Sequence, residues 1–91
     1  MSSTLCIRKT PILSPDAIRF KQPIKGIIAR KYYDHDGSLG GGLITVSPKD
    51  LLWWEGVLAA GPRVEPSELR ELEWVIKTLQ DGNTLDMWFE V

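Results

Sequence analysis

The stretch SPKDLLWWEGVLAAGP, residues 47–62, carries the clearest local fold signal in this chain of 91 residues. Ser47 is a typical N-cap residue, and Pro48 suits the first helical position because its missing N–H needs no partner there. Gly61 can adopt the left-handed conformation that ends a helix, and Pro62 prevents continuation. The stretch therefore predicts a helix that ends near Ala60. Its apolar stripe comprises Leu51, Trp54, Val57 and Leu58, with Trp53 on the flank.

Two further elements follow this helix. Residues 66–80 predict a second amphipathic helix, because apolar side chains recur at helical spacing. Its stripe comprises Leu69, Leu72, Val75, Ile76 and Leu79. Residues 84–91 alternate as a strand does, and therefore predict a closing strand. Its apolar side holds Leu85, Met87, Phe89 and Val91, and its polar side holds Asp86, Trp88 and Glu90.

The N-terminal half predicts three strands. Residues 5–8 favour a short strand at the edge of a sheet, because the prolines that follow cannot donate to a ladder. The proline-containing segment at about 9–23 predicts an irregular path. Residues 24–33 (IKGIIARKYY) favour a strand through their isoleucines and tyrosines, and 43–46 favour another. The glycine-rich residues 34–42 between them predict a loop.

These elements predict a single α+β domain over residues 1–91, of order β-β-β-α-α-β. The expected sheet is small and mostly antiparallel, with two helices packed on one face. Cys6 is the only cysteine, which excludes an internal disulfide and suits a reducing compartment. The start lacks the apolar run of a signal peptide, and no apolar stretch approaches the roughly 20 residues that span a bilayer. We therefore expect a cytoplasmic protein without a membrane partner.

Charge is distributed unevenly along the chain. Residues 1–33 hold seven basic side chains and one acid, a net +6, whereas residues 34–91 hold eleven acids and four bases, a net −7. Such asymmetry either steers a partner of opposite charge or is neutralised across the fold. The basic residues 8–31, with Tyr32 and Tyr33 as stacking platforms, make a small nucleic-acid-binding protein the alternative function. The negative overall charge and the lack of a recognised module argue against nucleic acid as a partner.

The segment Asp34-His35-Asp36-Gly37-Ser38 resembles the start of a calcium loop. The sixth and twelfth loop positions hold leucine and threonine, where glycine and glutamate are needed. Zinc needs more ligands than this segment supplies, and no nucleophile motif accompanies the histidine. The triple glycine at 40–42 lacks the lysine of a phosphate-binding loop. We therefore expect no enzyme activity, no metal and no cofactor. The segment is interpreted as a polar loop, with a secondary candidate role in partner contact for Asp34, His35 and Asp36.

Four tryptophans lie between positions 53 and 88, in a chain with one histidine. Trp54 falls on the apolar stripe of its helix, whereas Trp74 and Trp88 fall among charged residues. Exposed tryptophans ringed by charge are typical of binding hot spots. Alternatively, the proline-containing N-terminal segment covers one or both of them. The candidate partner-binding residues are Trp74, Trp88, Glu55, Glu71, Asp81, Asp86 and Glu90.

The segment 24–42, with its YYDHDGSLGG motif, resembles small immunity proteins encoded beside bacterial polymorphic toxins. LWWEG at 52–56 and DMWFEV at 86–91 are similar to the same proteins, so the resemblance covers roughly two-thirds of the chain. It implies a non-catalytic bacterial protein that binds and neutralises one cognate toxin. Many such toxins have basic clefts, which the acids and tryptophans named above would suit. A homodimer is compatible with this interpretation.

Overall fold

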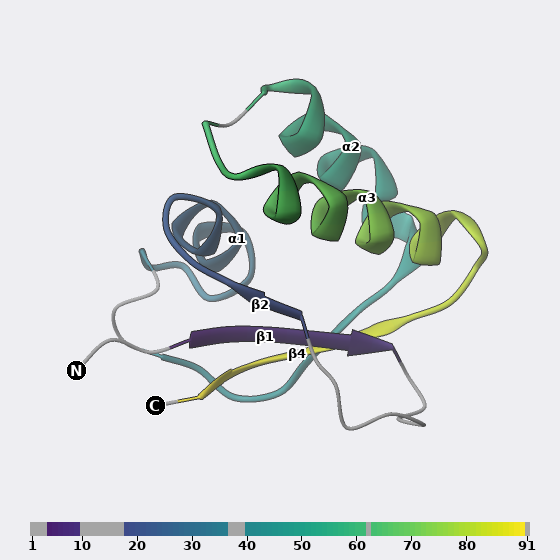
Figure 1. Cartoon of the computed structure of the whole chain (residues 1–91). Coiled ribbons are helices and arrows are strands. Elements are labelled where there is room, and N and C mark those ends of the chain that lie inside the picture. Colours follow the sequence, from purple (N-terminus) through teal and green to yellow (C-terminus); the bar gives the residue numbers. More distant parts are fainter. Residues whose placement is uncertain (1–3, 10–17, 37–39, 62, 91) are drawn as a thin grey trace.

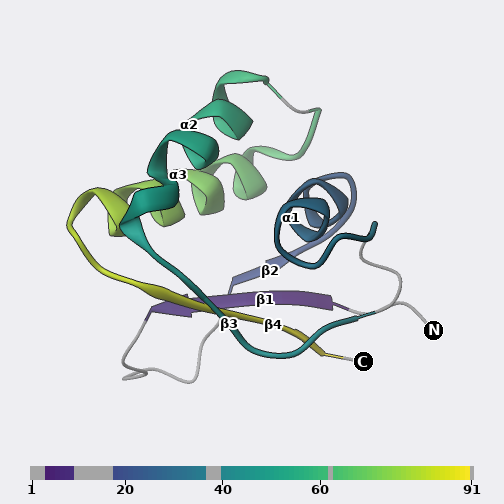
Figure 2. The ribbon, with the colours of Figure 1, turned by 180° about the vertical axis from the view of Figure 1, so that it is seen from behind.

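The computed structural model describes residues 4–9, 18–36, 40–61 and 63–90. In this part of the chain, a four-stranded antiparallel sheet is covered on one face by three helices (Figures 1 and 2). The elements in order are β1 (Thr4–Lys9), β2 (Ile18–Phe20), α1 (Ile24–Tyr32), β3 (Ile44–Val46), a 3₁₀ turn η1 (Pro48–Asp50), α2 (Leu51–Ala59), α3 (Pro66–Gln80) and β4 (Leu85–Glu90). The predicted α+β class with an antiparallel sheet is confirmed.

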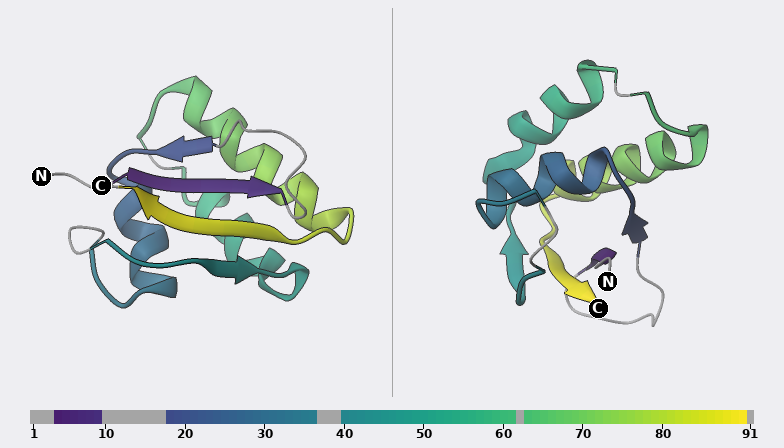
Figure 3. Two further views of the ribbon diagram at one scale, coloured as in Figure 1. Left: turned by 90° about the horizontal axis from the view of Figure 1, so that it is seen from below. Right: turned by 90° about the vertical axis from the view of Figure 1, so that its left-hand side faces the viewer.

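The sheet has the strand order β2-β1-β4-β3, so β1 lies in its interior (Figure 3, left). β1 pairs along its whole length with β4, from Thr4 opposite Glu90 to Lys9 opposite Leu85. The expected edge position of the first strand is therefore wrong. The two edges belong instead to β2 and β3, which have three residues each, and short edge strands limit unwanted pairing with other chains. The irregular segment expected at about 9–23 contains β2, while its residues 10–17 lie outside the described chain.

The strand predicted over residues 24–33 is wrong, because most of this segment forms helix α1. Ile24 and Ile28 lie one helical turn apart and are fully buried in the core. The Gln22 side chain supports the first turn, since its Oε1 accepts a hydrogen bond of 3.0 Å from the Gly26 N–H. The last turn carries Arg30 and Lys31, which suit the negative end of the helix dipole. The observed order is therefore β-β-α-β-α-α-β.

The helices predicted at 47–60 and 66–80 are both present, as η1 with α2 and as α3. The Ser47 side chain does not make the expected capping bond, and its buried Oγ has no hydrogen-bond partner among the described residues. A backbone bond of 3.1 Å from the Asp50 N–H to the Ser47 carbonyl closes a 3₁₀ turn instead.

The core fills the space between the sheet and the helices. Trp54 is its largest fully buried side chain and lies on the apolar stripe that the sequence predicted for α2. The other fully or almost fully buried members from the sheet and the helices include Leu5, Ile7, Leu85, Met87, Ile24, Ile28, Leu72, Val75 and Leu79. None of the described helices is long and apolar enough to cross a lipid bilayer.

Candidate functional site

The sequence-predicted partner-binding residues lie on separate elements. Glu55 belongs to α2, Glu71 and Trp74 belong to α3, and Asp81 follows the end of α3. Asp86, Trp88 and Glu90 alternate with the core-facing residues of β4 and so point to the face of the sheet that carries no helix. Glu71 and Trp74 line one groove, and Asp86, Trp88 and Glu90 share one face of the sheet, whereas Glu55 and Asp81 do not line that groove.

Trp74 borders a shallow groove between α3 and the edge strand β2. Its side chain is 39% exposed, and the groove, of about 380 Å³, is also lined by Ile18, Ser67, Arg70 and Glu71. Burial raises the pKa of Glu71, and the nearby carboxylate of Glu68 raises it further. One oxygen of each of these two glutamates is buried and accepts no hydrogen bond from the described residues.

The helix-free face of the sheet is engaged in its own contacts. The guanidinium carbon of Arg8 lies 4.5 Å from the centre of the Trp88 ring, a cation–π arrangement that partly covers the tryptophan. Arg19 on β2 lies 3.7 Å from the carboxylate of Glu90. Asp86 is only 8% exposed, although the sequence placed it on the polar side of its strand. This face therefore offers less free aromatic surface than the sequence predicted.

A third surface, which the sequence analysis missed, is an apolar groove between α1 and α2. It has a volume of about 430 Å³, and we call it the α1–α2 groove. Its lining residues are Ile27, Leu52, Trp53, Gly56, Val57 and Ala60. Leu52 is 83% exposed and Ile27 is 37% exposed, so large apolar side chains meet solvent on both helices. The groove was missed because residues 24–33 were interpreted as a strand, which left Ile27 without a place beside α2.

Trp53, which lines the α1–α2 groove, packs against a hydrogen-bonded cluster of Trp54, Tyr32 and Asp50. The indole N–H of Trp54 donates a hydrogen bond of 3.0 Å to the Tyr32 hydroxyl, which donates one of 2.9 Å to the Asp50 carboxylate. Burial raises the pKa of Tyr32 far above its ordinary value, so the hydroxyl stays protonated and remains a donor even in alkaline solution. Trp53 packs edge-on against both Tyr32 and Trp54, with ring centres 5.8 and 5.1 Å away. These contacts hold Trp53 in place at the edge of the groove.

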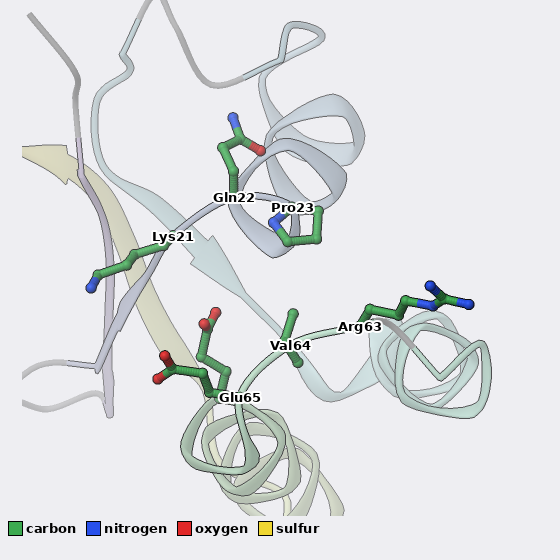
Figure 4. A pocket seen from close by; sticks show the side chains of 7 residues that line it. Lys21, Gln22, Pro23, Arg63, Val64 and Glu65 are labelled. Atoms are coloured by element: carbon green, nitrogen blue, oxygen red, sulfur yellow. The ribbon is translucent and has the colours of Figure 1, made fainter.

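A larger opening lies between the start of α1 and the start of α3. Its volume is about 520 Å³, and Figure 4 shows that the side chains of Lys21 and Arg63 extend away from one another. Glu65 and Glu68 bring negative charge to the same opening. Charges of both signs therefore line it, and they favour no single class of ligand.

The candidate loop Asp34–Asp36 is tied to the sheet and to α1. The Nε2 atom of His35 lies 2.6 Å from the Gly40 carbonyl, and its ring packs beside those of Tyr33 and Phe89. The Asp36 carbonyl accepts a hydrogen bond of 3.1 Å from the Gln22 amide. Within the described residues, no three histidine, cysteine or carboxylate side chains gather where they could hold a metal ion. The loop contacts observed here are those of a structural tether.

The basic residues of the segment 8–31 do not share one surface. Arg8 and Arg19 contact Trp88 and Glu90 on the sheet, whereas Lys25, Arg30 and Lys31 belong to α1. The stacking platforms expected at Tyr32 and Tyr33 are packed: Tyr32 against Trp53, and Tyr33 against Phe89 with ring centres 5.0 Å apart. Tyr32 and Tyr33 therefore offer less free ring surface for stacking than the sequence predicted.

Comparisons with protein-family models, with curated proteins and with solved structures found no match.

Proposed function

We propose that this protein is a non-catalytic protein-binding module and that the α1–α2 groove is its main docking surface. One observation carries the proposal: helix α2 (LLWWEGVLA) is apolar on nearly every side, yet only Trp54 and Val57 are buried. A helix that is apolar all round is normally covered on all sides. Exposed contiguous apolar surface on a soluble domain typically marks an interaction site. The exposed face of α2 therefore fits a surface that a second protein covers.

The form of the α1–α2 groove supports a protein rather than a small molecule. Small-molecule sites usually enclose most of the ligand and present a few polar groups that fix its orientation. This groove is shallow, and its lining residues have apolar side chains apart from the indole N–H of Trp53. Aromatic and aliphatic side chains of this kind commonly form the centre of protein interfaces.

The resemblance to immunity proteins makes a bacterial toxin the expected partner and the cytoplasm the expected place of action. In this version the protein neutralises the toxin by occupying its surface. The groove beside Trp74 and Glu71 would then be a second contact region, as the candidate residues from the sequence suggest.

The test is affinity capture of the tagged protein from its native lysate, with two matched variants. Leu52→Asp places a charge in the α1–α2 groove, whereas Leu43→Asp changes another exposed leucine, 67% exposed, that lies outside it. We expect one stoichiometric protein with the wild type and with Leu43→Asp. Leu52→Asp should weaken its binding by about 30-fold, the effect of losing an interface hot spot.

The identity of the captured protein decides the finer proposal. A secreted toxin would support the inhibitor version. Loss of the toxin's activity on binding would support inhibition directly. A different protein would remove the inhibitor version but leave the binding module in place. Recovery of the bait with nuclease-sensitive absorbance at 260 nm would replace the proposal with nucleic-acid binding.

A further inference from the structure

We infer that the α1–α2 groove receives a helix of the partner whose apolar face inserts a large side chain beside Gly56 and whose flank carries acidic residues. This inference rests on the proposed function and names the chemistry of the occupant. It is drawn from two independent features of the groove: an unfilled position on α2 and the charge along its α1 side.

The unfilled position is Gly56, in the middle of α2. A Cβ atom added there would meet no other atom within 4 Å, so the fold does not require a glycine. Glycine is less favourable than alanine in a helix interior, because it gains more freedom on unfolding. Leu52 and Ala60 lie one turn before and after Gly56, and all three line the groove. The absent side chain thus leaves a notch into which a knob from a facing helix can pack.

Two basic side chains of α1 lie close to the groove, although neither is among its lining residues. The Lys31 ammonium lies 5.3 Å from the centre of the Trp53 ring, and Arg30 follows Ile27 by one helical turn. In the part of the chain that the structure describes, neither Arg30 nor Lys31 forms an ion pair. Glu55 does not line the groove, and Asp36 lines a neighbouring depression with Arg30. Acidic residues on the flank of the bound helix would complement this side.

The same charge argues against a second copy of this chain as the occupant. A two-fold interface built from one groove on each copy would present the same surface twice. Lys31, which lies beside Trp53, would then border the interface from both copies. A separate partner with acidic flanks avoids this repulsion.

The experiment places the photo-cross-linking residue p-benzoylphenylalanine at position 52, 43 or 74 of the tagged full-length protein. After irradiation in the native lysate, mass spectrometry maps the cross-linked peptides. We expect position 52 to label one segment with apolar residues at a spacing of three and four and an excess of acids. Position 43, outside the groove, should give no such product.

Other labelling patterns would reject the α1–α2 groove, its inferred occupant or the proposed binding function. Labelling from position 74 but not from position 52 would keep a protein-binding function and reject the α1–α2 groove. Labelling from position 52 of a segment without excess acids, or of a second copy, would reject the inferred occupant. Co-sedimentation with vesicles of phosphatidylcholine and phosphatidylserine that Leu52→Asp abolishes would assign the groove to a lipid surface. No protein labelled from any position would reject the proposed function itself.

Charge and shape are then tested separately on the captured partner. The double variant Arg30→Glu/Lys31→Glu should associate at least about tenfold more slowly at low salt, whereas Lys77→Glu on α3 should associate normally. Gly56→Leu should fill the notch and weaken binding by about tenfold or more, with an unchanged circular-dichroism spectrum. Normal binding by both groove variants would reject the inference.

Discussion

The ring of Tyr33 packs so closely against Gly41 that position 41 has no room for a side chain. The Tyr33 ring lies against the Gly41 backbone, and its hydroxyl donates a hydrogen bond of 2.7 Å to the Gly42 carbonyl. The Gly41 carbonyl in turn accepts a bond of 3.1 Å from the Phe89 N–H, which links the glycine-rich segment to the last strand. Glycine is needed at position 41 because any Cβ would overlap the tyrosine ring.

We expect Gly41→Ala to destabilise the protein by about 1–3 kcal/mol, the usual cost of forcing an extra group into a packed site. Gly42→Ala is the matched control, because a Cβ at position 42 meets no atom within 4 Å. It should change the free energy of unfolding by less than about 0.5 kcal/mol. Urea denaturation of both variants measures the difference. Equal stabilities would show that Tyr33 moves aside freely.

Glu71 gives a prediction about pH. Its pKa is raised by burial and by Glu68, so folding favours the protonated carboxyl, and the ionised form opposes folding. The contribution of Glu71 to the free energy of unfolding is therefore most favourable below the ordinary pKa of 4.5. It is lost as the pH rises through the raised pKa that Glu71 has in the folded protein.

Glu71→Gln should accordingly raise the melting temperature at pH 7, and this advantage should shrink as the pH falls through the raised folded-state pKa and disappear below about 4.5. Glu73→Gln, an exposed change on the same helix, is the control for the loss of one negative charge. Thermal unfolding followed by circular dichroism across this pH range is the measurement. An equal gain from both variants would attribute the effect to net charge alone.

Helix α1 is where the sequence-based prediction of an element failed. Isoleucine and tyrosine favour strands, and the segment IKGIIARKYY contains five of them. The buried residues Ile24, Ile28 and Ala29 instead follow the spacing of a helix. Packing against the sheet and support from the Gln22 side chain outweighed the local preference.

Gly56 in helix α2 lowers the stability of the free protein. We expect Gly56→Ala to stabilise the free protein by up to about 1 kcal/mol, because alanine is the better helix former and the added methyl meets open space. Gly61→Ala should do the reverse, since Gly61 has a φ of +62° that disfavours a side chain. Chemical denaturation of both variants measures whether each substitution raises or lowers the free energy of unfolding. Destabilisation by Gly56→Ala would mean that the fold itself needs the glycine.

At the scale of the whole molecule, the two faces of the sheet are buried differently. Helices cover the face that carries Leu5 and Ile7, yet Cys6, which points the other way, is also fully buried. Burial raises the pKa of the Cys6 thiol, and the nearby Glu90 carboxylate adds to this effect. Because Cys6 is fully buried, the thiol becomes accessible only when the contacts that cover it open.

We therefore expect Cys6 to react with a disulfide reagent such as DTNB at the rate of unfolding, at pH 8 and without denaturant. Addition of urea beyond the unfolding transition should make the reaction immediate. As Cys6 is the only cysteine, the absorbance change reports on this site alone. Rapid labelling of the native protein would contradict the burial of this face.

The sequence by itself determined the elements whose pattern is local. The helical stretch at 47–60, the amphipathic repeat at 66–80 and the alternation at 84–91 each specify their own period, and each appears with nearly the expected bounds. It also predicted Trp54 as a core residue, because the tryptophan falls on the apolar stripe of its helix.

Only the tertiary structure decided the rest. The position of β1 in the sheet depends on pairing with β4, some 80 residues later, which no local pattern encodes. The α1–α2 groove exists because Ile27 on α1 lies beside Leu52 and Trp53 on α2. Local periodicity specifies which face of an element is apolar, whereas contacts between distant segments decide which apolar residues are buried and which remain exposed to a partner.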